Sequence, residues 1–215
     1  YANKTVLILL RDKIHFLREV FMIQRILMLA LVLLAFTMPT EAITFQELKT
    51  SPQFKLVHQH EYEKPSAIVN DGGGMYVYLN TYSVEVQKYA PPQYTLSAIY
   101  YVVHTSHYQA EIMENKLTVN YDANYSLATL IKSSNMMNPR PSMLALIEAS
   151  ESKSGLFMSD SDSAIYTLDG ALKKNPSSEG TRNLPLNRKN IIMYNLVDAM
   201  FMAAYQQHFD DIVVQ

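Results

Sequence analysis

The sequence predicts an α+β fold: an antiparallel β-meander sheet of about five to seven strands with one C-terminal helix packed across a face. Two observations support this prediction. Ten of the fifteen tyrosines fall between Tyr76 and Tyr125, among valines, isoleucines and threonines, and such side chains suit a pleated, half-buried surface. Near its end the chain contains a long apolar segment, residues 188–208, whose hydrophobic positions recur at helical spacing.

The composition limits the class of protein. With 215 residues, of which 48% are hydrophobic, the chain is long and apolar enough to form one packed domain. Its formal net charge of −2 gives no field that would attract nucleic acid, so we predict no nucleic-acid partner. The absence of cysteine excludes disulfides, thiolate metal sites, a cysteine nucleophile and a lipid-modified cysteine.

Residues 1–42 are predicted to be an N-terminal extension and signal peptide. Ile26–Phe36 is an unbroken apolar run that follows Arg25 and precedes a segment of small residues with Pro39. This is the order found in secretory signals. Cleavage after Ala42 would remove the segment, and we expect an exported protein, either periplasmic or extracellular at the cell surface.

A second interpretation keeps this segment. The basic residues before the apolar run would then hold it in the membrane as an uncleaved anchor, and the chain would contact a membrane through this segment alone. A run of about 11–13 residues is short for a membrane span, which needs roughly 20, and the length favours cleavage.

Residues 43–215 are predicted to form a single exported α+β domain. Five of the 18 basic and three of the 20 acidic residues lie before residue 43, which leaves 13 basic and 17 acidic residues and a formal net charge of −4. This mildly acidic balance disfavours nucleic acids and anionic membrane surfaces as partners of the domain.

Alternating hydrophobic and polar side chains predict the strands. The first six are Phe54–Tyr62, Met75–Asn80, Ser83–Lys88, Tyr94–Val103, Ala110–Tyr121 and Ser126–Ser133. The strand Tyr94–Val103 is apolar on both faces, so we expect it at the centre of the sheet. The alternation changes phase between Ile112 and Leu117, which predicts a bulge near Met113–Asn115.

The remaining segments are less regular. Phe45–Leu48 fits a short helical turn, and Met143–Ala149 fits either a strand or a short helix. Gly155–Leu168 is predicted to form a hairpin with its turn at Ser159–Ser163. The polar segment Gly170–Asn187 is predicted to be a surface loop.

Arg188–His208 is predicted to be the C-terminal helix, with Asn187 as its N-cap. Its hydrophobic arc, which includes Leu196 and Phe201, is too wide for a helix that stands free on the surface. We therefore expect the helix to cover one face of the sheet. Three pairs of side chains form that face: Val77 and Leu79, Val84 and Val86, and Leu117 and Val119.

Two histidines form a candidate metal site. His58 and His60 would project from one side of a strand, an arrangement that binds a transition metal when a third ligand lies near. Nothing in the sequence brings a third ligand to them. Asp160-Ser161-Asp162 resembles the start of a calcium loop, but Ile165 and Ala171 stand where an EF-hand requires glycine and glutamate. We therefore predict no metal and no other cofactor.

The sequence contains no recognisable catalytic motif. It has no nucleophile elbow and no His-Glu-x-x-His pair. Because sequence spacing alone cannot assemble a catalytic triad, an enzyme is not excluded, but a non-enzymatic protein is favoured.

The order of Tyr76-Val77-Tyr78-Leu79-Asn80-Thr81-Tyr82-Ser83-Val84, a proline-containing turn, a long strand and a C-terminal helix resembles small exported bacterial proteins of the surface-adhesin E type. The similarity covers roughly Phe54–Tyr121 and Arg188–His208. It implies an antiparallel sheet with a helix across it, and binding rather than catalysis. This chain departs from the family in having no cysteine, so neither a lipid anchor nor a helix-tethering disulfide carries over.

The predicted function is that of an exported, non-enzymatic binding or surface protein, and the alternative is a small periplasmic enzyme or metal-binding protein. Alternation places Tyr76, Tyr78 and Tyr101 on the sheet face opposite the helix. Tyrosine suits a contact surface because its ring covers a large area while its hydroxyl bonds polar groups. We predict that this face binds a protein partner or a second copy of the chain. The competing interpretation is that the tyrosines are ordinary sheet residues.

Overall fold

The computed structural model describes residues 43–62, 73–106, 109–137, 139–177 and 183–214, all within one compact unit, Ala42–Gln215. The predicted signal peptide, residues 1–42, lies outside the described residues, and its cleavage stays a prediction. Within the described ranges, no helix is both long enough and apolar enough to span a bilayer.

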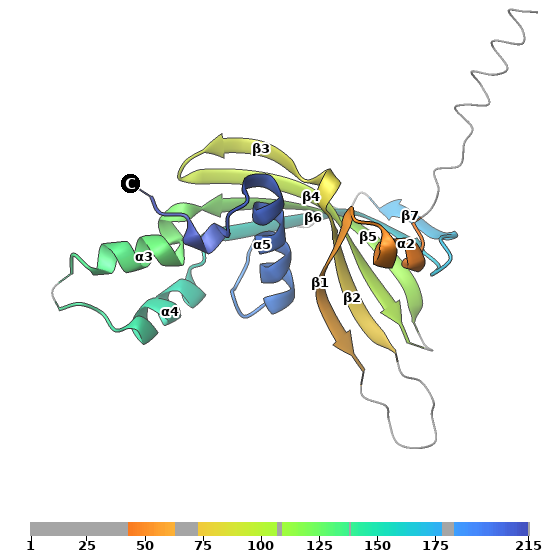
Figure 1. Ribbon diagram of the computed structural model, residues 1–215, viewed down its shortest axis with the longest axis horizontal. Coiled ribbons are helices and arrows are strands. Elements are labelled where there is room, and N and C mark those ends of the chain that lie inside the picture. The colour runs from red at the N-terminus through yellow and green to blue at the C-terminus, as the bar shows by residue number, and fades with distance from the viewer. Residues whose placement is uncertain (1–42, 63–72, 107–108, 138, 178–182, 215) are drawn as a thin grey trace, which may run out of the picture. The chain divides into compact units, whose positions relative to one another are not determined.

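Eight strands form one antiparallel sheet in the order β1-β2-β4-β5-β6-β7, with β3 beside β4 and β8 beside β6 (Figure 1). The strands are β1 (Phe54–Glu61), β2 (Gly74–Asn80), β3 (Glu85–Ala90), β4 (Gln93–Thr105), β5 (Ala110–Asp122), β6 (Leu156–Tyr166), β7 (Leu172–Ser177) and β8 (Leu184–Pro185). The predicted antiparallel meander is confirmed, but the predicted strand number is too low. Strands β7 and β8 lie within the segment predicted to be a loop, because pairing with β6 determines their conformation.

Strand β4 lies at the centre of the sheet, as predicted. One edge of β4 pairs along its length with β5, and the other edge pairs with β2 at one end and β3 at the other. A short 3-10 helix, η1 (Thr81–Ser83), separates β2 from β3. The N–H of Ile99 falls between these two partners and donates to Ser83 Oγ at 2.8 Å. A side chain therefore completes the hydrogen bonding where the ladder is interrupted.

Four helices are described: α2 (Phe45–Thr50), α3 (Leu127–Ser134), α4 (Met143–Ser152) and α5 (Ile191–Tyr205). The short helical turn predicted at Phe45–Leu48 is confirmed by α2, but the predicted fold, with one C-terminal helix on the sheet, has too few helices. The predicted strand Ser126–Ser133 is wrong because this segment forms α3. Ser126 caps that helix, with its Oγ accepting the N–H of Thr129 at 3.0 Å. Ser142 caps α4 in the same way, so Met143–Ala149 is helical rather than extended.

The predicted turn at Ser159–Ser163 is also wrong, because these residues lie inside β6. Asp160 pairs with Leu117 of β5, within a ladder that continues on both sides. Pairing with a neighbouring strand outweighs the turn propensity of serine and aspartate here. The ladder shifts register just after Glu114, which confirms the irregularity predicted near Met113–Asn115.

The first hydrophobic core lies between the sheet and α5. Leu196 and Phe201 of the helix are fully buried. The buried sheet residues of this core include Val77, Leu79, Leu117 and Val119, which confirms that the helix covers this face. The prediction is wrong for Val86, which is 46% exposed. Val86 lies on the edge strand β3, and every residue of this strand is exposed. The helix begins at Ile191, and its N-cap is Asn190 rather than Asn187.

A second core lies on the opposite face of the sheet. Its buried members are Ile43, Leu48, Phe54, Tyr78, Tyr101, Val103 and Ile112. Neighbouring residues of one strand separate the two cores, since Val77 belongs to the first and Tyr78 to the second. Helix α2 and its flanking residue Ile43 cover this face. The sheet therefore has hydrophobic packing on both faces.

Candidate functional site

The structure buries two of the three tyrosines that were predicted to form a binding face. They lie on the face opposite α5, as alternation predicts, but Tyr78 and Tyr101 are only 4% and 5% exposed. The Tyr101 ring packs edge-on against Phe54 at 5.6 Å, and the half-buried Tyr76 ring lies 5.4 Å from Phe45. Burial raises the pKa of both buried hydroxyls. The expectation of an open tyrosine face is therefore corrected, because α2 and its flanking residues cover this part of the sheet.

His58 and His60 share one side of β1, although a register shift within the strand turns them toward the α5 face. His60 lies opposite Met75 on β2, which in turn lies opposite His104 on β4. The two histidine-bearing strands are thus about two strand spacings apart, roughly 9–10 Å. His104 Nδ1 instead lies 3.1 Å from the Tyr62 hydroxyl. Within the described ranges, no group of three or more histidine and acidic side chains could hold a metal ion.

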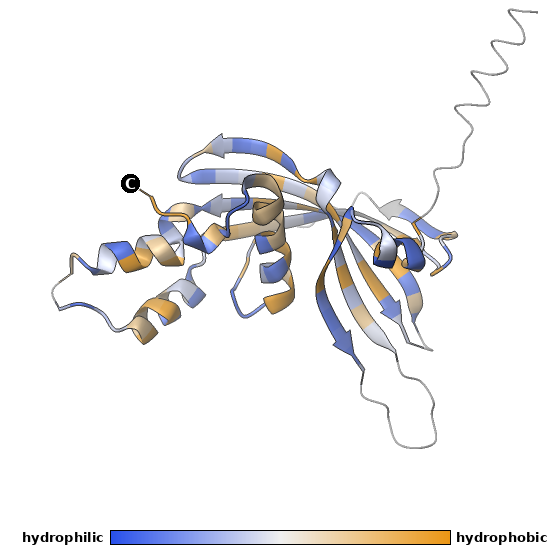
Figure 2. Ribbon diagram, viewed as in Figure 1, coloured by the Kyte–Doolittle hydropathy of each residue, from blue (hydrophilic) through white to orange (hydrophobic). Residues whose placement is uncertain are grey.

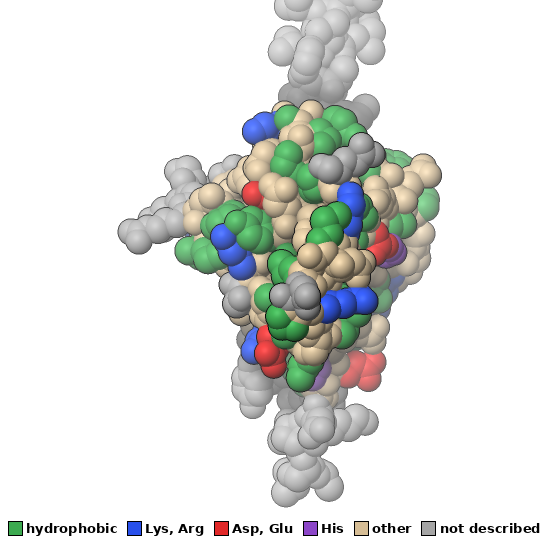
Figure 3. Space-filling view, turned by 90° about the vertical axis from the view of Figure 1, so that its left-hand side faces the viewer, with side chains coloured by type: hydrophobic (Ala, Val, Ile, Leu, Met, Phe, Trp, Pro, Cys, Tyr) green, Lys and Arg blue, Asp and Glu red, His purple; other side chains and the backbone are tan. Residues whose placement is uncertain are grey.

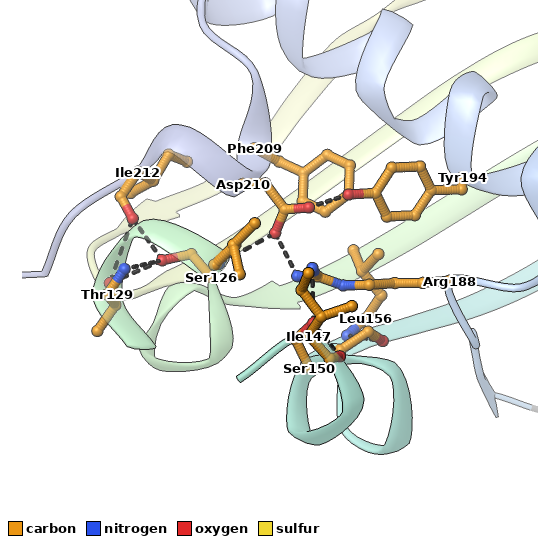
Figure 4. A network of polar contacts seen from close by, with 12 residues as sticks. Ser126, Thr129, Ile147, Ser150, Leu156, Arg188, Tyr194, Phe209, Asp210 and Ile212 are labelled. Carbon is orange, nitrogen blue, oxygen red and sulfur yellow. Dashed lines mark hydrogen bonds and ion pairs between the residues drawn. The ribbon is translucent and has the colours of Figure 1, made fainter. Parts of the chain in front are cut away.

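A buried polar network lies where α3, α4, α5 and the C-terminal tail meet (Figure 4). The Arg188 guanidinium forms an ion pair with the Asp210 carboxylate, and these side chains are only 12% and 15% exposed. Asp210 also accepts the Tyr194 hydroxyl and the N–H of Leu127. Arg188 donates to Ser150 Oγ at 3.0 Å. We call these five residues the Arg188 network.

The C-terminal tail is tied to α3 by a second set of bonds. The hydroxyls of Ser126 and Thr129 both donate to the carbonyl of Ile212. Lys132 Nζ donates to the carbonyl of Val214 at 3.2 Å, and the N–H of Val214 donates to Thr129 Oγ1 at 3.1 Å. The start of the α3–α4 hairpin is thereby fixed to the end of the chain.

The chemistry of the Arg188 network is that of a structural connection. Burial raises the pKa of Asp210 above its ordinary value, and the positive charge of Arg188 opposes this shift. The guanidinium is occupied by a carboxylate instead of being open to an anionic ligand. The one carboxylate among the five residues, Asp210, is held by Arg188, the Tyr194 hydroxyl and the N–H of Leu127. These contacts support a structural role, in which the network positions the base of the hairpin.

A pocket of about 420 Å³ lies at the start of β6. It is lined by Asp122, Tyr125, Glu151, Lys153, Ser154, Gly155, Leu156, Phe157, Pro185, Leu186 and Asn187. Its charged groups are engaged locally: the Lys153 ammonium lies over the Tyr125 ring at 4.2 Å, and Glu151 pairs with Lys189 at 3.5 Å. The Ser154 hydroxyl donates to a backbone carbonyl. These contacts support a structural role for the polar side chains of the pocket.

A half-buried acid on β6, Asp160, lies outside both the network and the pocket. The Tyr100 hydroxyl donates to Asp160 Oδ2 at 2.9 Å. Burial raises the pKa of Asp160, and the hydrogen bond from Tyr100 opposes the shift. Burial also raises the pKa of Tyr100, so its hydroxyl keeps the proton that it donates.

Substituting Asp160 by asparagine should change how stability depends on pH. Because the folded-state pKa lies above the reference value of 3.8, the folded protein binds this proton more tightly than the unfolded chain. The contribution of Asp160 to the free energy of unfolding is therefore greatest below pH 3.8 and falls as the pH rises through the folded-state pKa. Asp160→Asn keeps an acceptor for Tyr100 but does not ionise. We expect this variant to gain stability relative to the parent across that window, as measured by urea unfolding.

Asp169→Asn is the matched control for this experiment. The Thr167 hydroxyl lowers the pKa of the exposed Asp169, so its pH trend should have the opposite sign. Parallel pH profiles for the parent and Asp160→Asn would contradict the prediction.

An exposed hydrophobic surface lies at the end of the α3–α4 hairpin. Its members are between 40% and 82% exposed: Met136, Met137, Met143, Leu144 and Ile147. We call this surface the hairpin tip. The hairpin extends beyond the sheet in Figure 1, and Figure 2 shows α4 strongly hydrophobic near its start. In Figure 3, which faces this end of the domain, hydrophobic side chains lie among both basic and acidic ones.

Helix α4 exposes these side chains because little of it is packed. Its buried residues are Leu146 and Ser150, which lie one turn apart on a single line of the helix. Its main neighbour among the described elements is α3. The unbroken apolar run Met143–Ile147 is a sequence signal for this surface, since such a run places hydrophobic side chains on every side of a helix.

Comparison with known proteins found no match for this chain among protein families, curated proteins or solved structures. The resemblance to surface-adhesin E proteins therefore stays a prediction from the sequence.

Proposed function

We propose that the chain is an exported, non-enzymatic binding protein and that the hairpin tip is its contact surface. The observation that carries this proposal is the exposure of five large hydrophobic side chains between residues 136 and 147. Single exposed hydrophobic residues are common, whereas several together at one end of a domain mark an interaction surface. Three of the five are methionines, whose flexible side chains adapt to a partner's shape.

The way in which the hairpin is held supports the same proposal. The Arg188 network and the bonds from Ser126 and Thr129 to the tail fix the base of the hairpin. The hydrophobic end is thus presented on a supported element, which reduces the ordering cost of binding. The other polar candidates, the Arg188 network and the pocket, have their charged groups paired within the chain.

A photo-crosslinker tests this proposal in cells that produce the protein. Benzoylphenylalanine replaces Leu144 in one variant and Tyr82 in another, because Tyr82 is 77% exposed on η1, outside the hairpin. We expect the variant at Leu144, and not that at Tyr82, to form covalent adducts with a protein or a lipid after irradiation. A folded variant at Leu144 that forms no adduct, or equal adducts at both sites, would show that the hairpin tip is not the contact surface.

A further inference from the structure

We infer that the hairpin tip docks on an anionic lipid surface, an inference that rests on the proposed function and names its partner. The first observation is local charge. The segment from Ala123 to Ile147 contains no acidic residue, but it contains Lys132 and Arg140, which are both exposed. Lys132 Nζ donates to the carbonyl of Val214 in the C-terminal tail, a neutral acceptor that does not cancel its charge. The tip is therefore basic within a domain whose net charge over residues 43–215 is −4.

The acidic residues nearest to the tip in sequence lie in the second half of α4. Glu151 is paired with Lys189 at 3.5 Å, which leaves the exposed Glu148 as the acid that follows the hydrophobic run. The net negative charge of the whole domain disfavours binding to anionic membranes. The positive charge near the tip reverses this expectation, because salt screens interactions between charges that are more than about 10 Å apart.

The second observation is the position of the exposed hydrophobic side chains in the fold. Met136 and Met137 follow the end of α3, and Met143, Leu144 and Ile147 occupy the first half of α4. They therefore belong to a projecting end of the domain, whereas the 420 Å³ pocket lies at the other end of α4. Projecting apolar side chains flanked by basic ones suit the boundary between lipid headgroups and acyl chains. That boundary supplies both hydrocarbon for the tip and phosphate for Lys132 and Arg140.

A second copy of the chain is a poorer occupant. A symmetric contact between two hairpin tips would bring together two copies of Lys132 and two of Arg140, without an acid from the segment to separate them. A protein partner with an acidic, apolar surface would also match the tip chemically. Vesicle flotation distinguishes that partner from a lipid.

Vesicle flotation with the protein in its exported form tests this inference. The vesicles are phosphatidylcholine alone or an equal mixture of phosphatidylcholine and phosphatidylglycerol. We expect partitioning onto the anionic vesicles to exceed that onto neutral vesicles by about 30-fold at low salt, the amount expected for two basic residues near an anionic surface. Added salt should reduce the difference.

Two sets of variants separate the electrostatic contribution to vesicle binding from the hydrophobic one. Lys132→Gln with Arg140→Gln should remove the preference for anionic vesicles, and Leu144→Ser should weaken binding to both vesicles by about tenfold. The matched control is Lys55→Gln with Lys88→Gln, two exposed lysines on β1 and β3, which should bind like the parent. An unchanged melting temperature shows that each variant is folded.

Each other outcome overturns the lipid inference. Equal binding to both vesicles, or anionic binding that survives Lys132→Gln with Arg140→Gln, removes the electrostatic basis. Self-association that Leu144→Ser abolishes assigns the tip to a second copy. A protein adduct at Leu144 without vesicle binding leaves the proposed function intact and excludes lipid as the partner. No adduct and no vesicle binding reject both proposals.

Discussion

Replacing Leu196 by aspartate should unfold the domain, with a loss of at least about 4 kcal/mol in the free energy of unfolding. Leu196 is fully buried between α5 and the sheet. An aspartate there would be ionised at neutral pH without a partner, and burying an unpaired charge is far more costly than the lost methyl groups. Because a domain of this size is stable by about 5–15 kcal/mol, a loss of about 4 kcal/mol or more removes a large part of that stability, and a larger loss unfolds the domain.

Ala203→Asp is the matched control, because Ala203 lies on the exposed side of the same helix. It introduces the same residue into the same element, and its effect should stay within about 1 kcal/mol. Phe201→Asp, at a second fully buried position, should behave like Leu196→Asp. Circular dichroism during urea unfolding measures all three variants. A Leu196→Asp protein that unfolds at the parent's urea midpoint would show that α5 does not pack on the sheet as described.

The long periodic elements could be predicted from the sequence because many residues repeat the same signal. The meander from Met75 to Tyr121 alternates over whole strands, and α5 recurs at helical spacing over four turns. Helix α3 was missed because it has eight residues, and its β-branched Thr129 and Ile131 suit a strand as well as a helix. Its serine N-cap was the signal that could have identified it.

The second core could not be predicted, because alternation shows on which face of the sheet a side chain lies but not whether another element covers that face. The pattern correctly placed Tyr78 and Tyr101 opposite α5. Whether that face meets water depends on a six-residue helix, α2, which is too short to give a periodic signal. The same limit applies to the Arg188 network, since Leu127 and Asp210 are 83 residues apart and only tertiary packing brings them together.

Breaking the buried ion pair by Arg188→Met should cost about 3–5 kcal/mol in the free energy of unfolding. The substitution leaves the Asp210 carboxylate buried without its positive partner, although Tyr194 and Leu127 still donate to it. The control is Lys189→Met, which breaks a pair whose side chains are 73% and 36% exposed and should cost less than about 1 kcal/mol. Equal effects of the two substitutions would show that burial of the Arg188 pair contributes nothing.

A double variant, and the pH dependence of its stability, identify why Arg188→Met lowers the free energy of unfolding. Arg188→Met with Asp210→Leu removes both charges, so it should be more stable than Arg188→Met alone if the penalty arises from an unpaired charge.

In Arg188→Met the opposing influence of the guanidinium is gone, which leaves burial to raise the pKa of Asp210 further above 3.8. The folded variant then binds the Asp210 proton more tightly than the unfolded chain does. The destabilisation by Arg188→Met should therefore be greatest above the raised pKa and diminish as the pH falls through it, whereas the double variant should lack this trend. A pH-independent loss in both variants would instead assign the effect to packing of the arginine side chain between α4 and the C-terminal tail.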